Sequence, residues 1–149
     1  MQGLSKRCLV LGNASTAKRS KTKMTMNMTP NDDLALASAW IELQHIPVET
    51  SNYDTLASAA VNLNNLCLTD EDRAWNLVKA VFESSSDEWV IENLGAGPVE
   101  SLLDFHPSVT IKKIERYVAE RPDFKKVLAH VWTSRLSTEH QQALSKSMR

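Results

Sequence analysis

Apolar residues recur at spacings of three and four along most of this chain, from Leu34 onward. No segment alternates apolar and polar residues over the length of a strand. The first pattern places apolar side chains along one face of a helix, whereas a half-buried strand shows the second. Only four glycines and five prolines occur in 149 residues, which favours long helices over many short strands. The sequence therefore predicts an all-α protein.

Capping residues and prolines divide this pattern into separate amphipathic helices. Because the connections between them are short, neighbouring helices are expected to pack antiparallel. The segments 39–41 and 74–76 both contain Ala-Trp and lie 35 residues apart, a spacing typical of two-helix repeats. We therefore expect about seven to eight short antiparallel helices in a compact HEAT-like helical array. The expected helices cover about 31–45, 53–68, 70–83, 87–94, 98–105, 109–120, 122–132 and 138–145.

The first 29 residues have a different composition from the rest. They carry six Lys and Arg residues and no acid, so the remainder has a formal charge of −7. Low hydrophobicity with like charge is typical of disorder. We predict a disordered basic leader over 1–29 and a single helical domain over 30–146. The sequence leaves open whether the leader is native, follows from a misassigned start, or was added for expression.

Several function classes lack their sequence signatures. No apolar run is long enough to span a membrane. Cys8 and Cys67 are far apart and suit a reducing cytosol, so we expect a cytoplasmic protein with no disulfide framework. The four histidines lie in different segments, none at metal-ligand spacing from another ligand, and no catalytic or phosphate-binding motif occurs. We expect no metal, no cofactor and no catalytic activity.

The segment 93–103 contains two of the four glycines, a proline and a carboxylate. Gly95 is suited to end one helix in a left-handed conformation, and Pro98 is suited to the first turn of the next. Gly97 falls near the N-cap and Glu100 in the first turn, where a carboxylate favours the helix dipole. We predict a tight helix–helix corner that the carboxylate closes by accepting backbone hydrogen bonds within it.

Candidate site residues lie in and around this corner. Glu100 and Asp104 are four residues apart and so share one helix face, either as a solvated acidic face or as part of a site. Trp89 is placed either in the core or in an exposed patch. The candidate binding residues are Trp89, Asn93, Glu100 and Asp104. The residues predicted to be structural, three of them on apolar stripes, are Trp40, Trp75, Gly95, Gly97, Pro98 and Trp132.

The ordered sequence resembles an uncharacterised bacterial family, catalogued as domain of unknown function 6869. The resemblance spans about residues 38–145 and rests on Ala74-Trp75, Ala96-Gly97-Pro98-Val99-Glu100, Pro122-Asp123-Phe124 and Val131-Trp132. The family pattern has Leu where this chain has Val99 and Asp where it has Ser101, which removes one acid from any site the family uses. It also has the acid before the proline where this chain has Pro122-Asp123. The resemblance implies a small helical domain and no particular activity.

Three function classes remain open from the sequence. The first is a helical protein–protein interaction module with an unknown partner, supported by the acidic body and stacked amphipathic helices. The second is an immunity or toxin-neutralising protein with one basic partner, which a neighbouring toxin gene would indicate. The third is an enzyme that uses Glu100. Nucleic acid is not expected as a partner except through the basic leader, and the sequence does not define an oligomeric state.

Overall fold

The computed structural model describes residues 30–149, so the expectations for the leader lie outside the described residues. The described part consists of helices and their connections, without a strand, which confirms the predicted all-α array. Residues Asp33–Arg149 form one compact unit. The elements are α3 (Pro30–Leu43), α4 (Tyr53–Thr69), α5 (Glu71–Ser84), α6 (Glu88–Leu94), a π-helical segment (Gly95–Val99), α7 (Glu100–Phe105), α8 (Pro107–Glu120), a 3₁₀ turn (Pro122–Phe124), α9 (Lys125–Leu128) and α10 (Thr138–Met148).

Side-chain caps begin several of these helices. The carboxylate of Asp87 and the hydroxyl of Ser137 accept first-turn backbone N–H groups of α6 and α10. Helix α5 begins at Glu71, one residue after the predicted start. Asp70 is its N-cap, and the Asp70 carboxylate accepts the Arg73 N–H, whereas the Thr69 hydroxyl donates to the carbonyl of Asn65 within α4, at 2.8 Å.

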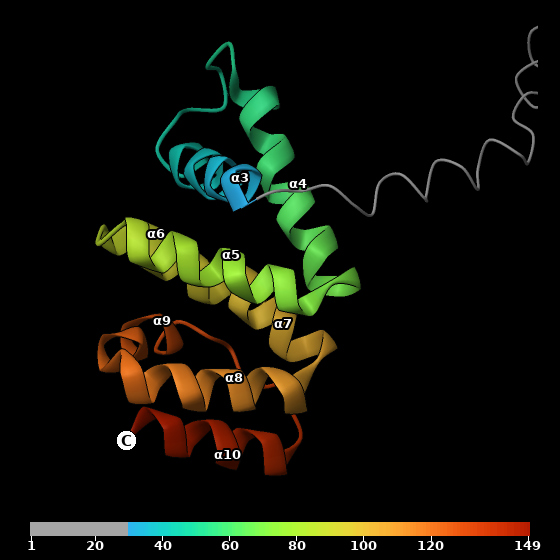
Figure 1. Cartoon of the computed structure of the whole chain (residues 1–149), viewed down its shortest axis with the longest axis vertical. Coiled ribbons are helices and arrows are strands. Elements are labelled where there is room, and N and C mark those ends of the chain that lie inside the picture. The colour runs from blue at the N-terminus through green and yellow to red at the C-terminus, as the bar shows by residue number, and fades with distance from the viewer. Residues whose placement is uncertain (1–29) are drawn as a thin grey trace, which may run out of the picture. The chain divides into compact units, whose positions relative to one another are not determined.

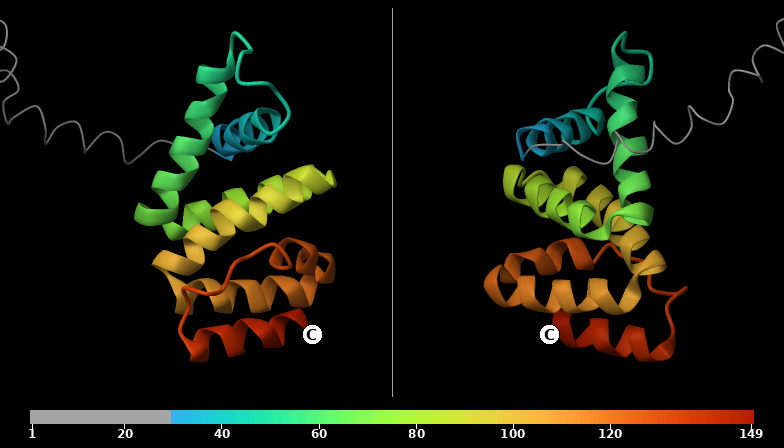
Figure 2. Two further views of the ribbon diagram at one scale, coloured as in Figure 1. Left: turned by 180° about the vertical axis from the view of Figure 1, so that it is seen from behind. Right: turned by 45° about the vertical axis from the view of Figure 1, so that its right-hand side comes forward.

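The helices after α4 form stacked layers (Figures 1 and 2). Helix α5 runs antiparallel to the continuous rod of α6, the π-helical segment and α7, and α8 runs antiparallel to that rod. Helix α10 packs on α8 but runs parallel to it, unlike the antiparallel neighbours expected. This parallel arrangement is possible because residues 129–137, between α9 and α10, lead the chain back across the layer to the end where α8 begins.

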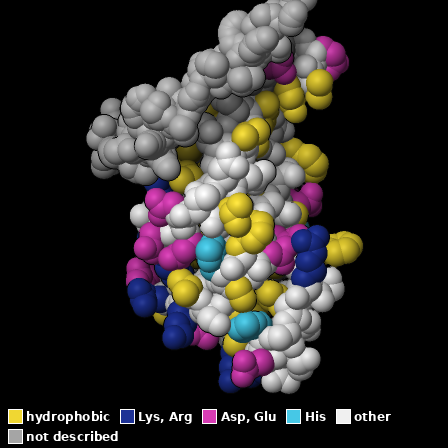
Figure 3. Space-filling model, turned by 90° about the vertical axis from the view of Figure 1, so that its right-hand side faces the viewer, with side chains coloured by type: hydrophobic (Ala, Val, Ile, Leu, Met, Phe, Trp, Pro, Cys, Tyr) yellow, Lys and Arg dark blue, Asp and Glu magenta, His cyan; other side chains and the backbone are white. Residues whose placement is uncertain are grey.

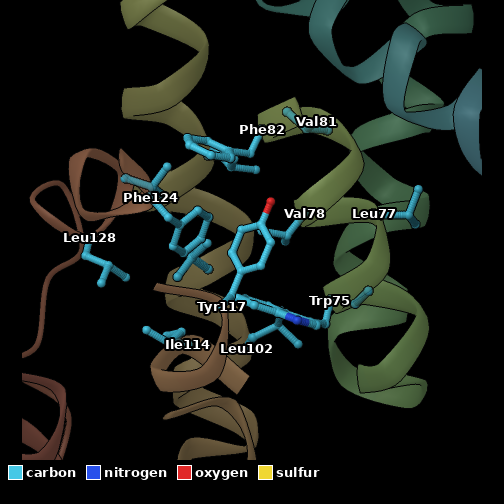
Figure 4. Packing of buried hydrophobic residues seen from close by; sticks show 14 of the residues in the cluster. Trp75, Leu77, Val78, Val81, Phe82, Leu102, Ile114, Tyr117, Phe124 and Leu128 are labelled. Carbon is cyan, nitrogen blue, oxygen red and sulfur yellow. The ribbon is translucent and has the colours of Figure 1, made fainter. Parts of the chain in front are cut away.

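An aromatic cluster between α5, α8 and the 3₁₀ turn forms the centre of the core (Figure 4). The rings of Phe82, Tyr117 and Trp75 all meet Phe124 edge to face, with centroids 5.0, 5.1 and 5.7 Å apart. Phe124 is fully buried and Trp75 is 5% exposed. Edge-to-face pairs add about 0.5–1.5 kcal/mol beyond the burial of apolar area. This cluster fixes the spacing of the α5 and α8 layers.

Helix α3 also contributes to the buried core. Ala37 and Trp40 are buried, so the tryptophans of the two segments spaced 35 residues apart both lie inside. A polar contact also joins α3 to α5. Arg73 of α5 donates two hydrogen bonds to the Asp33 carboxylate of α3, at 2.6 and 2.9 Å. No helix within residues 30–149 is both long and apolar enough to cross a bilayer.

Candidate functional site

The predicted corner at 93–103 is not a break between helices. Helix α6 passes through the π-helical segment into α7, and Gly95 has right-handed helical dihedrals, φ −69° and ψ −48°, rather than the expected left-handed ones. The backbone N–H of Glu100 donates to the carbonyl of Gly95, five residues earlier. Such widened turns occur mostly as short insertions in α-helices, frequently at functional sites.

The two glycines of the π-helical segment have different roles. A Cβ on Gly95 would lie 2.3 Å from the carbonyl oxygen of Val127 and 3.1 Å from Cβ of His130. Only glycine therefore allows the end of α9 to approach the rod this closely. A Cβ on Gly97 would meet nothing within 4 Å. The predicted structural role at Gly97 thus has no steric basis in the fold.

Pro98 is buried in the same segment and connects it to α4. A proline inside an α-helix clashes with the carbonyl four residues earlier, and the wider π turn relieves that clash. The Cys67 thiol donates to the Pro98 carbonyl at 3.7 Å, and Nε2 of His106 lies 3.0 Å from the Cys67 carbonyl. Burial raises the pKa of the Cys67 thiol to about 11. Cys67 is therefore a protonated core thiol that helps to seat the rod against α4.

Glu100 and Asp104 both hold the segment 129–137, which we call the Trp132 loop. The backbone N–H of Trp132 donates to Oε2 of Glu100 at 2.9 Å, so this carboxylate does not close its own corner as predicted. One turn further along α7, Nη1 of Arg135 donates to Oδ2 of Asp104 at 2.7 Å. The two carboxylates share one helix face, as their spacing predicted, and that face lies against the loop.

The start of the Trp132 loop follows the rod as well. Nδ1 of His130 lies 3.9 Å from Oε2 of Glu92, and Cβ of His130 lies close above Gly95. The loop therefore runs beside the rod in the same direction, with contacts at 92–95, 100 and 104. Three anchored points hold a segment that has no regular secondary structure of its own.

The Trp132 side chain is 74% exposed, which corrects its predicted place on a buried helical stripe. The prediction extended the helix to residue 132, but α9 ends at Leu128. The chain leaves the helix because the N–H groups of His130 and Val131 donate to carbonyls three residues earlier, which tightens the last turn. Among the large hydrophobic residues described, none is more exposed than Trp132.

Trp89 and Asn93 lie on α6 and make contacts different from those of the acidic pair. Trp89 is 53% exposed, and its Nε1 donates to the carbonyl of Gln44 after α3, at 2.9 Å. The Asn93 amide donates to the Trp89 carbonyl within the helix, at 2.8 Å. No hydrogen bond or ion pair among residues 30–149 joins these two residues to the Trp132 loop. The candidate binding residues thus fall into two groups.

Charge is divided along the sequence in a way that the analysis of single segments missed. Residues 30–106 contain 14 Asp and Glu but two Lys and Arg, a formal charge of −12, whereas residues 107–149 contain four and nine, a charge of +5. A running sum of charge would have found this. On the face in Figure 3, hydrophobic side chains are scattered among acidic, basic and histidine ones rather than gathered into one continuous patch. The described residues include no cluster that could hold a metal ion.

These observations define a small all-α domain in which a π-helical rod carries an exposed tryptophan loop. The chain belongs to the family described as "Family of unknown function (DUF6869)", whose model matches residues 48–148. The match covers the π-helical segment, α7 and the Trp132 loop. No curated protein and no solved structure shows significant similarity to the chain.

Proposed function

We propose that this chain is a bacterial, cytoplasmic helical module for protein–protein interaction, without catalytic activity, and that Trp132 is its main contact residue. One observation carries the proposal: the Trp132 side chain is 74% exposed, while its backbone is hydrogen-bonded to Glu100. Tryptophan is among the residues most enriched in the energetic centres of protein interfaces. An apolar side chain that stays in water does not contribute hydrophobic free energy to the stability of the isolated domain.

The anchoring of the Trp132 loop supports the same proposal. Ordering a flexible loop on binding costs about 0.5–1.5 kcal/mol per immobilised side chain. Here Glu100 holds the loop at Trp132 and Asp104 holds it at Arg135 before any partner arrives. A preordered loop loses less conformational entropy on binding than a flexible one, so a single anchor side chain on it contributes more to affinity. Val131 and Leu136 of the same loop pack on the core, so the loop is also held from its inner side.

Site-specific photocrosslinking tests the proposal directly. A benzoylphenylalanine residue is introduced at position 132 of the full chain in native host cells. Val48, a hydrophobic residue that is 70% exposed, provides the matched control position. We expect a discrete crosslinked adduct from position 132 and none of the same mass from position 48. No adduct from position 132, or the same adducts from both positions, would overturn the proposal.

The variant Trp132→Ala shows whether the fold can be separated from the interaction. Substitutions at exposed positions usually change the free energy of unfolding by less than about 0.5 kcal/mol. We therefore expect an unchanged melting temperature and loss of co-purification of the crosslinked partner. Full retention of the partner by a folded Trp132→Ala protein would show that the indole is not the main contact.

The charge of residues 30–106 favours a second, narrower function, in which the partner is one basic toxin that the chain neutralises. A formal charge of −12 on this part of the domain attracts basic proteins and accelerates their encounter. The immunity hypothesis is tested by expressing the neighbouring gene, where it encodes a large secreted toxin, with and without this chain. Protection of growth by the wild type supports it, and killing in the presence of the folded chain contradicts it.

A further inference from the structure

We propose that Trp132 and Glu100 together bind an arginine side chain of the partner, with the guanidinium stacked on the indole and hydrogen-bonded to the carboxylate. This inference rests on the proposed function and specifies the chemistry that the Trp132 loop recognises. It follows from the free ring surface, the unused carboxylate oxygen and the acidic charge around them.

The indole supplies a face for a cation. An arginine or lysine over an aromatic ring is attracted by the negative face of the ring, and tryptophan is the strongest of the three aromatic side chains in this role. The cation–π contacts present within the fold involve other rings, with Lys79 over Tyr117 and Arg121 over Phe82. The Trp132 ring has no such partner within residues 30–149, and it is 74% exposed.

The Glu100 carboxylate supplies the second contact. Its Oε2 accepts the backbone N–H of Trp132 at 2.9 Å, which places the group directly beside the base of the indole side chain. Its Oε1 has no hydrogen-bond partner among the described residues. A group stacked on the indole can therefore also donate to this oxygen. The neighbouring Asp104 is not equivalent, because Arg135 already occupies it.

The other charged groups along the loop are consistent with a cationic ligand. Arg135 is neutralised by its ion pair with Asp104, and the Glu92 carboxylate, 48% exposed, adds negative charge on the preceding turns of the rod. The −12 charge of residues 30–106, which include the rod, outweighs the +5 of residues 107–149, which include the loop, and so extends this attraction beyond the loop. Guanidinium suits the two contacts better than ammonium, because it is planar, stacks on aromatic faces and donates from its edge.

The probes are the capped tripeptides Gly-Arg-Gly, Gly-Lys-Gly and Gly-citrulline-Gly, added to the full ¹⁵N-labelled chain. Citrulline keeps the shape of arginine but has no charge. The Trp132 indole N–H signal is assigned by its absence in Trp132→Phe. We expect this signal to shift saturably with the arginine peptide, with binding about tenfold weaker for the lysine peptide and none for citrulline.

Two variants separate a local site from general attraction. Glu100→Gln retains an oxygen that can accept the Trp132 N–H but removes the charge, and we expect it to abolish the saturable shift. Glu49→Gln removes one charge from the loop after α3, away from the Trp132 loop, and serves as the control. We expect Glu49→Gln to bind the arginine peptide as the wild type does. Binding should weaken as salt increases.

Three results would overturn the arginine site. They are equal shifts with citrulline or lysine, no saturable shift at Trp132, or equal losses in Glu100→Gln and Glu49→Gln. A crosslinked partner at position 132 combined with any of these would leave the interaction function standing and reject only arginine recognition. Failure of the crosslinking would instead reject the interaction function on which this site rests.

Discussion

Two tryptophans on neighbouring layers of this domain have opposite surroundings. Trp75 lies among aromatic side chains and is 5% exposed, whereas Trp132 is 74% exposed beside the carboxylate-bearing face of α7. The Trp75 region is held together by burial and ring contacts, and the Trp132 loop by hydrogen bonds to two carboxylates together with the burial of Leu136. The comparison shows that an apolar side chain becomes core only where its backbone directs it towards other apolar side chains, since Leu136 of the same loop is buried while Trp132 is not.

The largest expected effect is at Trp75. Truncation of a buried tryptophan typically costs about 3–5 kcal/mol, because the lost contacts leave a cavity. Trp75 meets both Tyr117 and Phe124, so Trp75→Ala removes contacts between the α5 and α8 layers. We expect an insoluble or molten protein without a native near-ultraviolet circular dichroism spectrum. A native spectrum with a small stability change would mean that the cluster does not organise the layers.

The next largest effect separates the two glycines of the π-helical segment. Gly95→Ala forces a Cβ against the Val127 carbonyl, and overpacking of this kind costs about 1–3 kcal/mol. Gly97→Ala has open space and should be neutral or stabilising by up to about 1 kcal/mol, because alanine favours helix. Urea unfolding of both variants measures the difference. Equal effects would contradict the close approach at Gly95.

Tyr117→Phe tests the core under alkaline conditions. Tyr117 donates to Oε2 of Glu83 at 2.6 Å, and its burial together with the Glu83 carboxylate raises the pKa of the phenol. Above the unfolded pKa of about 10, the phenol is ionised in the unfolded chain but still protonated in the folded one. The free energy of unfolding therefore falls as pH rises from there towards the folded pKa. We expect the wild type to lose more stability than Tyr117→Phe between pH 9 and about 11, measured by urea unfolding.

The smallest of these effects is expected at the loop. Glu100→Ala removes the acceptor of the Trp132 N–H, at a cost of about 1 kcal/mol or less because the bond is exposed to solvent. Hydrogen exchange at the Trp132 amide should accelerate, while amides of α5 and α8 keep their protection. Slow exchange at Trp132 in this variant would show that another contact orders the loop.

Helical periodicity was sufficient to predict the all-α class and most helix positions, because α4, α5 and α8 each show an uninterrupted apolar stripe. It was not sufficient at the rod. Glycine followed by proline predicts a helix break from the local sequence, but here the widened π turn accommodates Pro98 and the helix continues. The end of α9 was missed for a related reason, since Val131-Trp132 continues the apolar pattern beyond the last helical residue.

The candidate site was predictable only in part. The spacing of Glu100 and Asp104 placed both on one face, and that face was found. Their partners lie 32 and 31 residues away, and no sequence pattern indicates such a long-range pairing. The sequence also did not show that Trp89 lies apart from Glu100 and Asp104. The hydrogen-bond partner of Trp89 is Gln44, which lies 45 residues before it.

The π-helical segment also sets the rotational phase of α7. A widened turn contains one residue more than an α-helical turn, and each residue of an α-helix turns the following side chains by about 100°. Because the N–H of Glu100 donates to the Gly95 carbonyl, Glu100 takes the place that Val99 would have in an ordinary α-helix. If the same residues formed an ordinary α-helix, Glu100 and Asp104 would be rotated by about 100°, away from the loop that they now hold. The widened turn thus decides whether an intact helix presents its carboxylates to the tryptophan loop or to another neighbour.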